Sequence, residues 1–485
     1  MKILFCGRHL QRIATHSCLV GVLCSAWGSS VLAGSFFDDP FGTSKAVPSY
    51  SSRLTFSHKN GCNFEQPLPK PLELIDALER SLCQNPQTLQ TWAAIKQQAA
   101  AIGVQNAAYL PTASVTGNWA DASKYINSPG YAQHDYGFTT HSTDLNLNIN
   151  WVLYDFGLRS SNLENAKQLF NAALASHDVE LLTVFQDAMQ NYCQAQANEA
   201  LLAATIDAEH SAEENFRAAD AKYKIGVGTL ADKLQAQTSL AQATLKRSQA
   251  SSNLQNSIGA LAMSMGYKPN IVINLPALED KVPNINSIVK SIDVLIDDAI
   301  RMHPKILTAK AQILAARSEY DTAVAINRPT ISLFTSLERS GAPIVQVSAG
   351  EVIKTRNIGI QISVPIFDGF SSKYKSRAAQ AKIEFAQYEL KGAEQKVANE
   401  VWVNYQNFLA ELSNLETTEI LIQSATQSFE VSKGRYKAGI GNILELLKAQ
   451  SDLSDAKQQR ILALAKWKIA RYNLAISLGA LPEIY

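Results

Sequence analysis

Glycines supply the most suggestive pattern for chemistry in this chain, in the segment GVGTLA at 226–231. Its spacing is that of the fingerprint whose backbone cradles the pyrophosphate of a dinucleotide, and that fingerprint requires a preceding strand. Here the preceding residues, 158–225, contain neither Gly nor Pro and have a helical pattern. A related segment, GIGNIL at 439–444, also follows helical sequence. Both are therefore predicted to be turns between helices, with a glycine in the left-handed conformation.

The other reactive side chains form no recognisable active site. Eight histidines are scattered along the chain without an HExxH or CxxC motif, and there is no P-loop. His177 and His210 each stand alone in helical sequence, where a histidine is more often solvated than a metal ligand. A formal net charge of +1 gives no sign of nucleic-acid binding. We therefore predict no enzymatic activity, no catalytic residue, no metal, no cofactor and no nucleic-acid partner.

The N-terminal segment 1–33 has the order of a secretory signal peptide. Lys2, Arg8 and Arg12 precede a mostly apolar stretch that ends in Val-Leu-Ala before Gly34. The alternative is a membrane anchor, which the polar residues within the stretch disfavour. None of the three cysteines in this segment has a full lipobox. No later stretch has the roughly 20 consecutive apolar residues of a transmembrane helix. We expect an exported chain that begins at Gly34.

Export places the remaining cysteines in an oxidising compartment, where disulfides persist. Cys62 lies in an irregular arm that follows the signal peptide, and Cys83 lies in the first helical segment. We predict that these two pair, tying the arm to the helices, and that Cys193 is buried as a small apolar residue. The alternative is three free thiols.

The mature chain is an internal duplication. Pro86 corresponds to Pro304, and YLPTAS corresponds to NRPTIS farther on at the same offset. A second, slightly smaller offset relates Asp155 to Asp368 and YKIGVGTLADKLQAQTSL (223–240) to YKAGIGNILELLKAQSDL (436–453), which share eight identities in 18 positions. The predicted organisation is a signal peptide (1–33), an N-terminal arm (34–71), a first repeat (72–266), a linker (267–293), a second repeat (294–479) and a short tail (480–485).

Each repeat has the same predicted order of elements. A helix (about 72–109 and 294–327) precedes two strands joined by a polar loop, and the second strand ends at Asp155 or Asp368. A very long helix, a glycine turn and another helix follow. Apolar residues recur at sevens in the first long run, which is typical of coiled-coil packing. Gly392 and Gly434 are expected to interrupt the second run. The loops at about 121–142 and 340–355 are expected to face the cell exterior.

The second strand of each repeat alternates between apolar and polar residues. In TDLNLNINW (143–151), Leu145, Leu147, Ile149 and Trp151 alternate with three asparagines, and Ile358, Ile360, Ile362 and Val364 have the same phase in the second repeat. One apolar and one hydrated face over about ten residues is typical of a transmembrane β-barrel strand. Four strands cannot close a barrel, so several chains must contribute: a dimer gives eight strands and a trimer twelve. The asparagines favour the wider, water-filled barrel.

The duplication, the P-x-F-D-G junction between strand and helix, and the Y-x-x-G-x-G-x-x-x-[DE]-x-L-x-A-Q turn resemble the TolC-like outer membrane efflux family. The resemblance implies a mixed α and β membrane protein: a homotrimer with a twelve-stranded β-barrel in the lipid of the outer membrane and a twelve-helix tunnel across the periplasm. It also implies two partners, a periplasmic adaptor protein and an inner-membrane ABC transporter or other pump.

Two functions within that family, and one outside it, are compatible with the residues. LCQNPQTLQTW (82–92) is similar to members that serve type I secretion of large toxins, such as adenylate cyclase toxin exporters. The alternative is a channel for multidrug efflux. A structural exported coiled-coil protein is the distant alternative, since it would explain long helices but not four strands in phase.

The resemblance also indicates which residues act at the periplasmic end. It implies an acidic constriction, in which Glu445 matches a ring position and Asp232 is its counterpart in the first repeat, with Lys448 where the family often has a second acid. Tyr223 and Tyr436 would link neighbouring helices in the closed state. The alternative for both acids is a solvated position near a helix start, which the helix dipole favours. The turns expected to dock the adaptor contain Gly226, Gly228, Gly439 and Gly441.

Overall fold

The computed structural model describes residues 38–48, 62, 68–126, 130, 136–279, 291–341 and 352–480. The predicted signal peptide (1–33), the centres of the two expected exterior loops, part of the linker and all but the first residue of the tail lie outside these residues.

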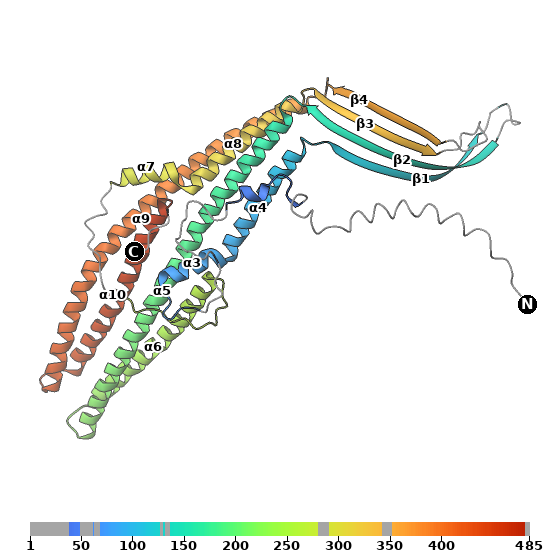
Figure 1. Ribbon diagram of the computed structural model, residues 1–485. Coiled ribbons are helices and arrows are strands. Elements are labelled where there is room, and N and C mark those ends of the chain that lie inside the picture. The colour runs from blue at the N-terminus through green and yellow to red at the C-terminus, as the bar shows by residue number, and fades with distance from the viewer. Residues whose placement is uncertain are drawn as a thin grey trace, which may run out of the picture.

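An elongated molecule carries a four-stranded sheet at one end and two helical hairpin turns at the other (Figure 1). Corresponding helices of the two repeats begin and end at one constant offset before the sheet and at a second, slightly smaller one after it. The elements are a short 3₁₀ helix η1 (Thr43–Ala46), α3 (Leu74–Gln84), α4 (Pro86–Ala107), β1 (Thr112–Ile126), β2 (Tyr136–Tyr154), α5 (Leu158–Lys224), α6 (Leu230–Ser264), α7 (Ile292–Met302), α8 (Pro304–Ala325), β3 (Thr330–Gly341), β4 (Val352–Ser363), α9 (Ser371–Lys437) and α10 (Ile443–Ser477).

The first helix of each repeat is two helices, which corrects the expectation of single helices over 72–109 and 294–327. α3 ends before Pro86 and α7 ends before Pro304, and each proline begins the next helix. Proline lacks the N–H of a helix interior and forces the preceding residue into extended backbone. Asn85 and His303 accordingly have ψ near 130° and cap the new helices, accepting from the N–H groups of Gln87 and Lys305.

The cap at His303 predicts a pH dependence of stability. Its side chain is 3% exposed, and burial, helped by nearby Lys305, lowers its pKa from 6.5 to about 4. The unfolded chain therefore takes up a proton first as the pH falls, so stability is lost between pH 6.5 and pH 4. His303→Asn, which copies the cap at position 85, should flatten this slope by up to about 1.4 kcal/mol per pH unit. Denaturant unfolding followed by circular dichroism at several pH values measures it, and an unchanged slope would contradict the assignment to His303.

The long helix of the second repeat is continuous, which corrects the expected interruptions at Gly392 and Gly434. α5 and α9 both contain 67 residues, which corresponds to about 100 Å of helix. A glycine in a helix costs about 1 kcal/mol relative to alanine. Packing along so long a helix outweighs that cost, because α9 contacts both α8 and α10 over its length. Among the described residues, no helix combines the length and apolar composition of a membrane span.

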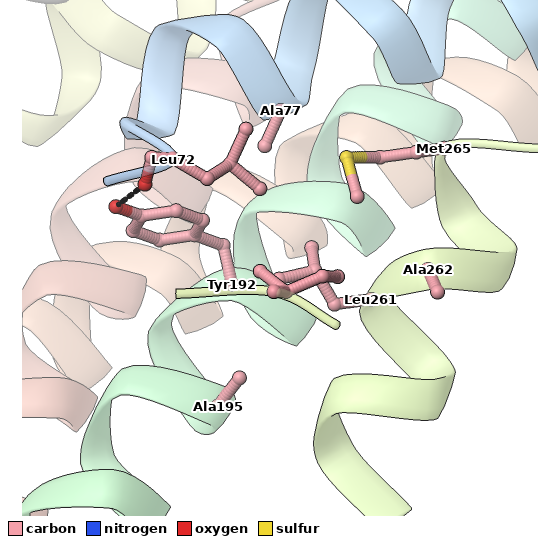
Figure 2. Close-up of a cluster of buried hydrophobic side chains, with 8 residues drawn as sticks. Leu72, Ala77, Tyr192, Ala195, Leu261, Ala262 and Met265 are labelled. Carbon is pink, nitrogen blue, oxygen red and sulfur yellow. Dashed lines mark hydrogen bonds between the residues drawn. The ribbon is translucent and has the colours of Figure 1, made fainter. Parts of the chain in front are cut away.

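A buried layer of side chains joins the helices midway along the molecule. Figure 2 shows Tyr192 of α5 beside Leu72, with Leu261 of α6 and Met265, the residue after α6, close by. The Tyr192 hydroxyl donates to the Leu72 carbonyl at 3.0 Å, so the buried phenol is satisfied. Cys193 lies in the adjacent cluster with Phe185, and burial raises the pKa of its thiol to about 12. The thiol therefore stays protonated and serves as an apolar side chain.

The sheet is antiparallel in the order β1-β2-β3-β4, and its register separates an apolar face from a polar one. Paired residues share a face. One row contains Ala113, Ile149, Thr335 and Ile358, and the next contains Val115, Leu147, Leu337 and Arg356. On the other face, Ser114, Asn148, Ser336 and Asn357 form one row, and Thr116, Asn146, Glu338 and Thr355 form the next. The phase predicted from the second strands therefore extends across the whole sheet.

Candidate functional site

The two glycine turns close the helical hairpins with the same geometry. Gly226 and Gly439 follow α5 and α9 with φ of +78° and +76°, and their N–H groups donate to the carbonyls of Tyr223 and Tyr436. The next residue donates back to the carbonyl before that tyrosine, which is the helix-ending pattern that favours glycine. At Gly441 a Cβ would lie 2.9 Å from the backbone nitrogen of Tyr436, so the second glycine permits close backbone approach. Both segments are turns, as the sequence predicts.

Asp232 caps the helix that follows the first turn. Its backbone N–H donates to the Thr229 hydroxyl at 3.1 Å, and its carboxylate accepts from the Thr229 N–H at 3.3 Å. This reciprocal capping box places the carboxylate in the first turn of α6, where the helix dipole also favours it. Within the protomer, Asp232 therefore acts as a capping residue at the start of α6, which agrees with the second of the two interpretations given for this acid.

Glu445 has a basic partner. Its carboxylate lies 3.2 Å from the guanidinium of Arg435, at the end of the opposite helix of the same hairpin. Both side chains are largely solvated, so the pair contributes under about 1 kcal/mol. Lys448 pairs within its own helix with Asp452 at 2.5 Å, and this hydrogen bond raises the pKa of Lys448. The positive charge of Arg435 therefore offsets the negative charge of Glu445 at this tip.

Tyr436 and Tyr223 have different surroundings. Tyr436 is 9% exposed, and the Lys222 ammonium of the other hairpin lies 3.8 Å from its ring centroid and donates to its carbonyl at 3.3 Å. Burial, with the nearby Asp232 carboxylate, raises the pKa of Tyr436. Tyr223 is half exposed and lies near Lys233 of its own hairpin, 5.3 Å from ring to ammonium. Only the first of these contacts bridges the two hairpins.

Further polar contacts bridge the hairpins above the tips, and Gln450 makes two of them because it also donates to the Ala208 carbonyl at 3.3 Å. Asn215 of α5 donates to the side chain of Gln450 of α10 at 2.5 Å, and both residues are buried. Lys246 of α6 lies 3.3 Å from Asp455 of α10. Below them, a groove of about 430 Å³ separates the tips and is lined by Asp232, Gly228, Gly439 and Gly441, among others, with the Lys222–Tyr436 contact. Near the tips, within the described residues, polar contacts around this groove therefore join the hairpins.

Comparison with known proteins decides the family. The model of a family described as outer membrane efflux protein matches residues 77–267 and 295–480, one match for each repeat. The chain belongs to the outer membrane efflux protein family. It is therefore an outer membrane transport protein, as the sequence predicts, and the four-stranded sheet and long helices are those of this family.

Individual members of the outer membrane efflux protein family are similar over most of their length. The chain is 26% identical to protein CyaE of Bordetella pertussis over 424 residues, covering 86% of this chain and 87% of that one. It is 23% identical to the alkaline protease secretion protein AprF of Pseudomonas aeruginosa over 421 residues, covering 85% of each. The crystal structure of the Campylobacter jejuni CmeC outer membrane channel has the same fold, with a TM-score of 0.72, 18% identity and coverage of 84% of this chain and 85% of that one.

Sequence reasoning on this efflux-family protein missed the partners of the residues that it selected. Lys222, Arg435, Asn215 and Gln450 were not identified, although the basic-Tyr pairs at 222–223 and 435–436 occupy equivalent positions in the repeats. That repetition is a usable signal for a tip contact. Thr229-x-x-Asp232 is likewise a capping-box pattern that the sequence displays.

The structure joins the N-terminal arm of the efflux-family protein to its helices at two places. Cys62 and Cys83 form a disulfide with their Cα atoms 5.5 Å apart. The disulfide is on α3, and the second contact is on the next helix, α4. There η1 packs against the helix, and Thr43 lies against Gly103. The arm is therefore fixed at both points, one of them covalent.

Removing the disulfide should destabilise this region. The bridge closes a segment of 21 residues, for which restriction of the unfolded chain contributes about 3 kcal/mol. Cys62→Ser should lower the midpoint of unfolding and speed proteolysis of the arm, as should treatment of the wild-type protein with a reductant. Peptide mapping without reduction provides the direct check, because alkylation of Cys62 under those conditions would reject the bridge.

Proposed function

We propose that this protein is, as a homotrimer, the outer-membrane exit duct of a tripartite machine for type I secretion of a protein. The observation that carries the proposal is the sheet at the end of the long helices, with one predominantly apolar face and one predominantly polar face. That division fits lipid outside a barrel and water inside it. The sheet has two open edges, β1 and β4, and unpaired edges are not tolerated in lipid. Pairing β4 with β1 of the next copy removes both edges, and three copies give a twelve-stranded barrel.

The polar face favours a wide barrel over a closed core. Asn146, Asn148 and Asn150 point to this side, together with Asp144, whose carboxylate accepts from Ser340 at 2.5 Å. Amides and carboxylates in a dry interior would need many internal partners. An eight-stranded dimer barrel has an interior just wide enough to be filled by side chains, whereas twelve strands leave room for water.

The hairpin tips are the proposed periplasmic gate. Lys222 reaches Tyr436 within a protomer, and Arg435 and Tyr223 are the equivalent residues of the repeats. In a ring of alternating hairpins, Arg435 of one copy would face Tyr223 of the next, which completes the set of tip contacts. We further propose that the turns containing Gly226, Gly228, Gly439 and Gly441 dock a periplasmic adaptor, which in turn connects to an inner-membrane ABC transporter.

The acids at the tips predict a modest ion preference. Three copies bring six carboxylates from Asp232 and Glu445 to one end of the tunnel, but Arg435 offsets half of them. Asp232→Asn with Glu445→Gln preserves side-chain size and the acceptor of the helix cap. This double variant should reduce cation selectivity at low salt by a few-fold, because field focusing falls with the ring charge. Reversal potentials in planar bilayers measure the change. Unchanged selectivity and unchanged block by multivalent cations would rule out a role for the two acids.

The cargo is proposed to be a protein because the relatives that match over most of the chain include an alkaline protease secretion protein. Multidrug efflux is the second candidate, since the same duct serves either cargo. Deleting the gene from its native host separates them. Loss of one large protein from the culture supernatant, with unchanged drug sensitivity, is the expected result. Increased drug sensitivity with an unchanged supernatant would favour efflux instead. Absence of the protein from the outer membrane fraction would favour a structural role.

A further inference from the structure

Three basic side chains interrupt the apolar face of the sheet near its outer end. Arg339 lies on β3, and Lys354 and Arg356 lie on β4. The register pairs Arg339 with Lys354 and Leu337 with Arg356, so all three point to the same side as Leu337. All three are exposed. We call them the basic trio.

The trio lacks a neutralising partner within the part of the chain that the structure describes. Glu338 is next to Arg339 but belongs to the opposite, polar face. The acid that the described strands place on the apolar face is Asp121, and it pairs with His141 on the neighbouring strand. Like charges placed directly across two strands destabilise a sheet. The Arg339–Lys354 pair is therefore unfavourable unless an anion lies against it.

The position of the trio indicates the kind of anion. From the helix end of the sheet, the rows of β3 and β4 on this face run Ile331–Ile362, Leu333–Ile360 and Thr335–Ile358, and the basic residues follow. Trp119 lies on the same face of β1, one row farther out than Arg339, and is 76% exposed. Tryptophan and basic side chains mark the headgroup level of a membrane. The trio therefore lies at the level where the hydrocarbon ends.

We propose that Arg339, Lys354 and Arg356 bind phosphate groups on lipid headgroups of the outer leaflet. This rests on the barrel proposed above, in which the apolar face contacts lipid. Guanidinium groups bind phosphate oxygens in a bidentate manner, and a lysine beside them adds a point charge. The isoleucine rows below contact acyl chains of the same molecule, which is why the site takes a phosphorylated lipid over a soluble phosphate. A trimer carries three such sites.

Lipid binding to the full-length purified trimer tests this. The triple variant Arg339→Gln, Lys354→Gln, Arg356→Gln is compared with a control, Lys268→Gln, Lys391→Gln, Lys396→Gln, which removes three exposed lysines from the helical part. The probes are radiolabelled diphosphorylated lipid A, the same lipid after removal of its phosphates, and inorganic pyrophosphate. We expect the Kd for lipid A to rise at least about tenfold in the first variant and to stay unchanged in the control.

Three results would overturn the proposal. The first is that lipid A binds both variants equally, and the second is that the wild type binds the phosphate-free lipid as tightly as lipid A. The third is that pyrophosphate displaces lipid A, which would indicate a site for a soluble phosphate. Conductance in planar bilayers separates this from the proposed function, because the triple variant should conduct as the wild type does. If the triple variant fails to assemble, the three single variants carry the test, each with a several-fold rise in Kd.

Discussion

Lys222→Met combined with Gln450→Leu should raise the single-channel conductance of the proposed trimer in planar bilayers several-fold. The first change removes the ammonium that bridges to Tyr436, a contact worth about 0.5–2 kcal/mol. The second leaves the amide of Asn215 buried without its partner, which costs about 1–3 kcal/mol in the closed arrangement and is relieved when the hairpins separate. With three copies the effects add to roughly 5–15 kcal/mol, enough to reverse a two-state population.

A matched control isolates the bridging contacts. Lys224→Met with Gln458→Leu removes the same side-chain types, but Lys224 pairs with Asp220 on its own helix and Gln458 contacts Ser454 on its own helix. Its conductance should remain near that of the wild type. Equal conductance of the two double variants would show that Lys222 and Gln450 do not hold the tips together.

Ile358→Arg should abolish assembly in the outer membrane, whereas Asn357→Arg should not. The two residues are neighbours on β4 but lie on opposite faces, and Ile358 is 77% exposed on the apolar side. An arginine at mid-depth on a lipid face costs about 2–4 kcal/mol per copy, whereas one that points into a water-filled lumen costs little. Trimer that resists dissociation in cold detergent, recovered from the outer membrane fraction, provides the measurement. Similar recovery of both variants would mean that the apolar face does not contact lipid.

The repeats and the faces of the strands could be predicted because they depend on spacing alone. Two constant offsets relate the bounds of corresponding helices, and period-two alternation fixes which side of the sheet each residue occupies. The breaks at Pro86 and Pro304 were also visible in the sequence and were missed, because helical periodicity continues across them. At Gly392 and Gly434 the opposite error occurred, because breaks were predicted where the helix is continuous. The low helix propensity of glycine is outweighed by packing in a helix with neighbours along its length.

The tip contacts could not be predicted because they depend on the axial register of separate hairpins. Lys222 and Tyr436 are far apart in the sequence, and a shift of one helical turn would separate them. Sequence indicated that Glu445 lies at a tip but not that Arg435 would offset its charge, since that pair spans a turn. The sulfur pairing of Cys62 and Cys83 was easier to predict, because so few thiols remain after export.

Because α5 and α9 have equal lengths, the two repeats set the same distance from the sheet to the hairpin tips. Adding or deleting one turn in a single helix would move its tip by about 5.4 Å, more than a hydrogen bond or ammonium–ring contact can span. Lys222 and Tyr436 would then miss each other, and so would Asn215 and Gln450. Changes in reach must therefore occur in both halves together, in whole turns. The distance between membrane and tip can therefore change only in steps of a whole helical turn, and any protein that binds the tips has to match it.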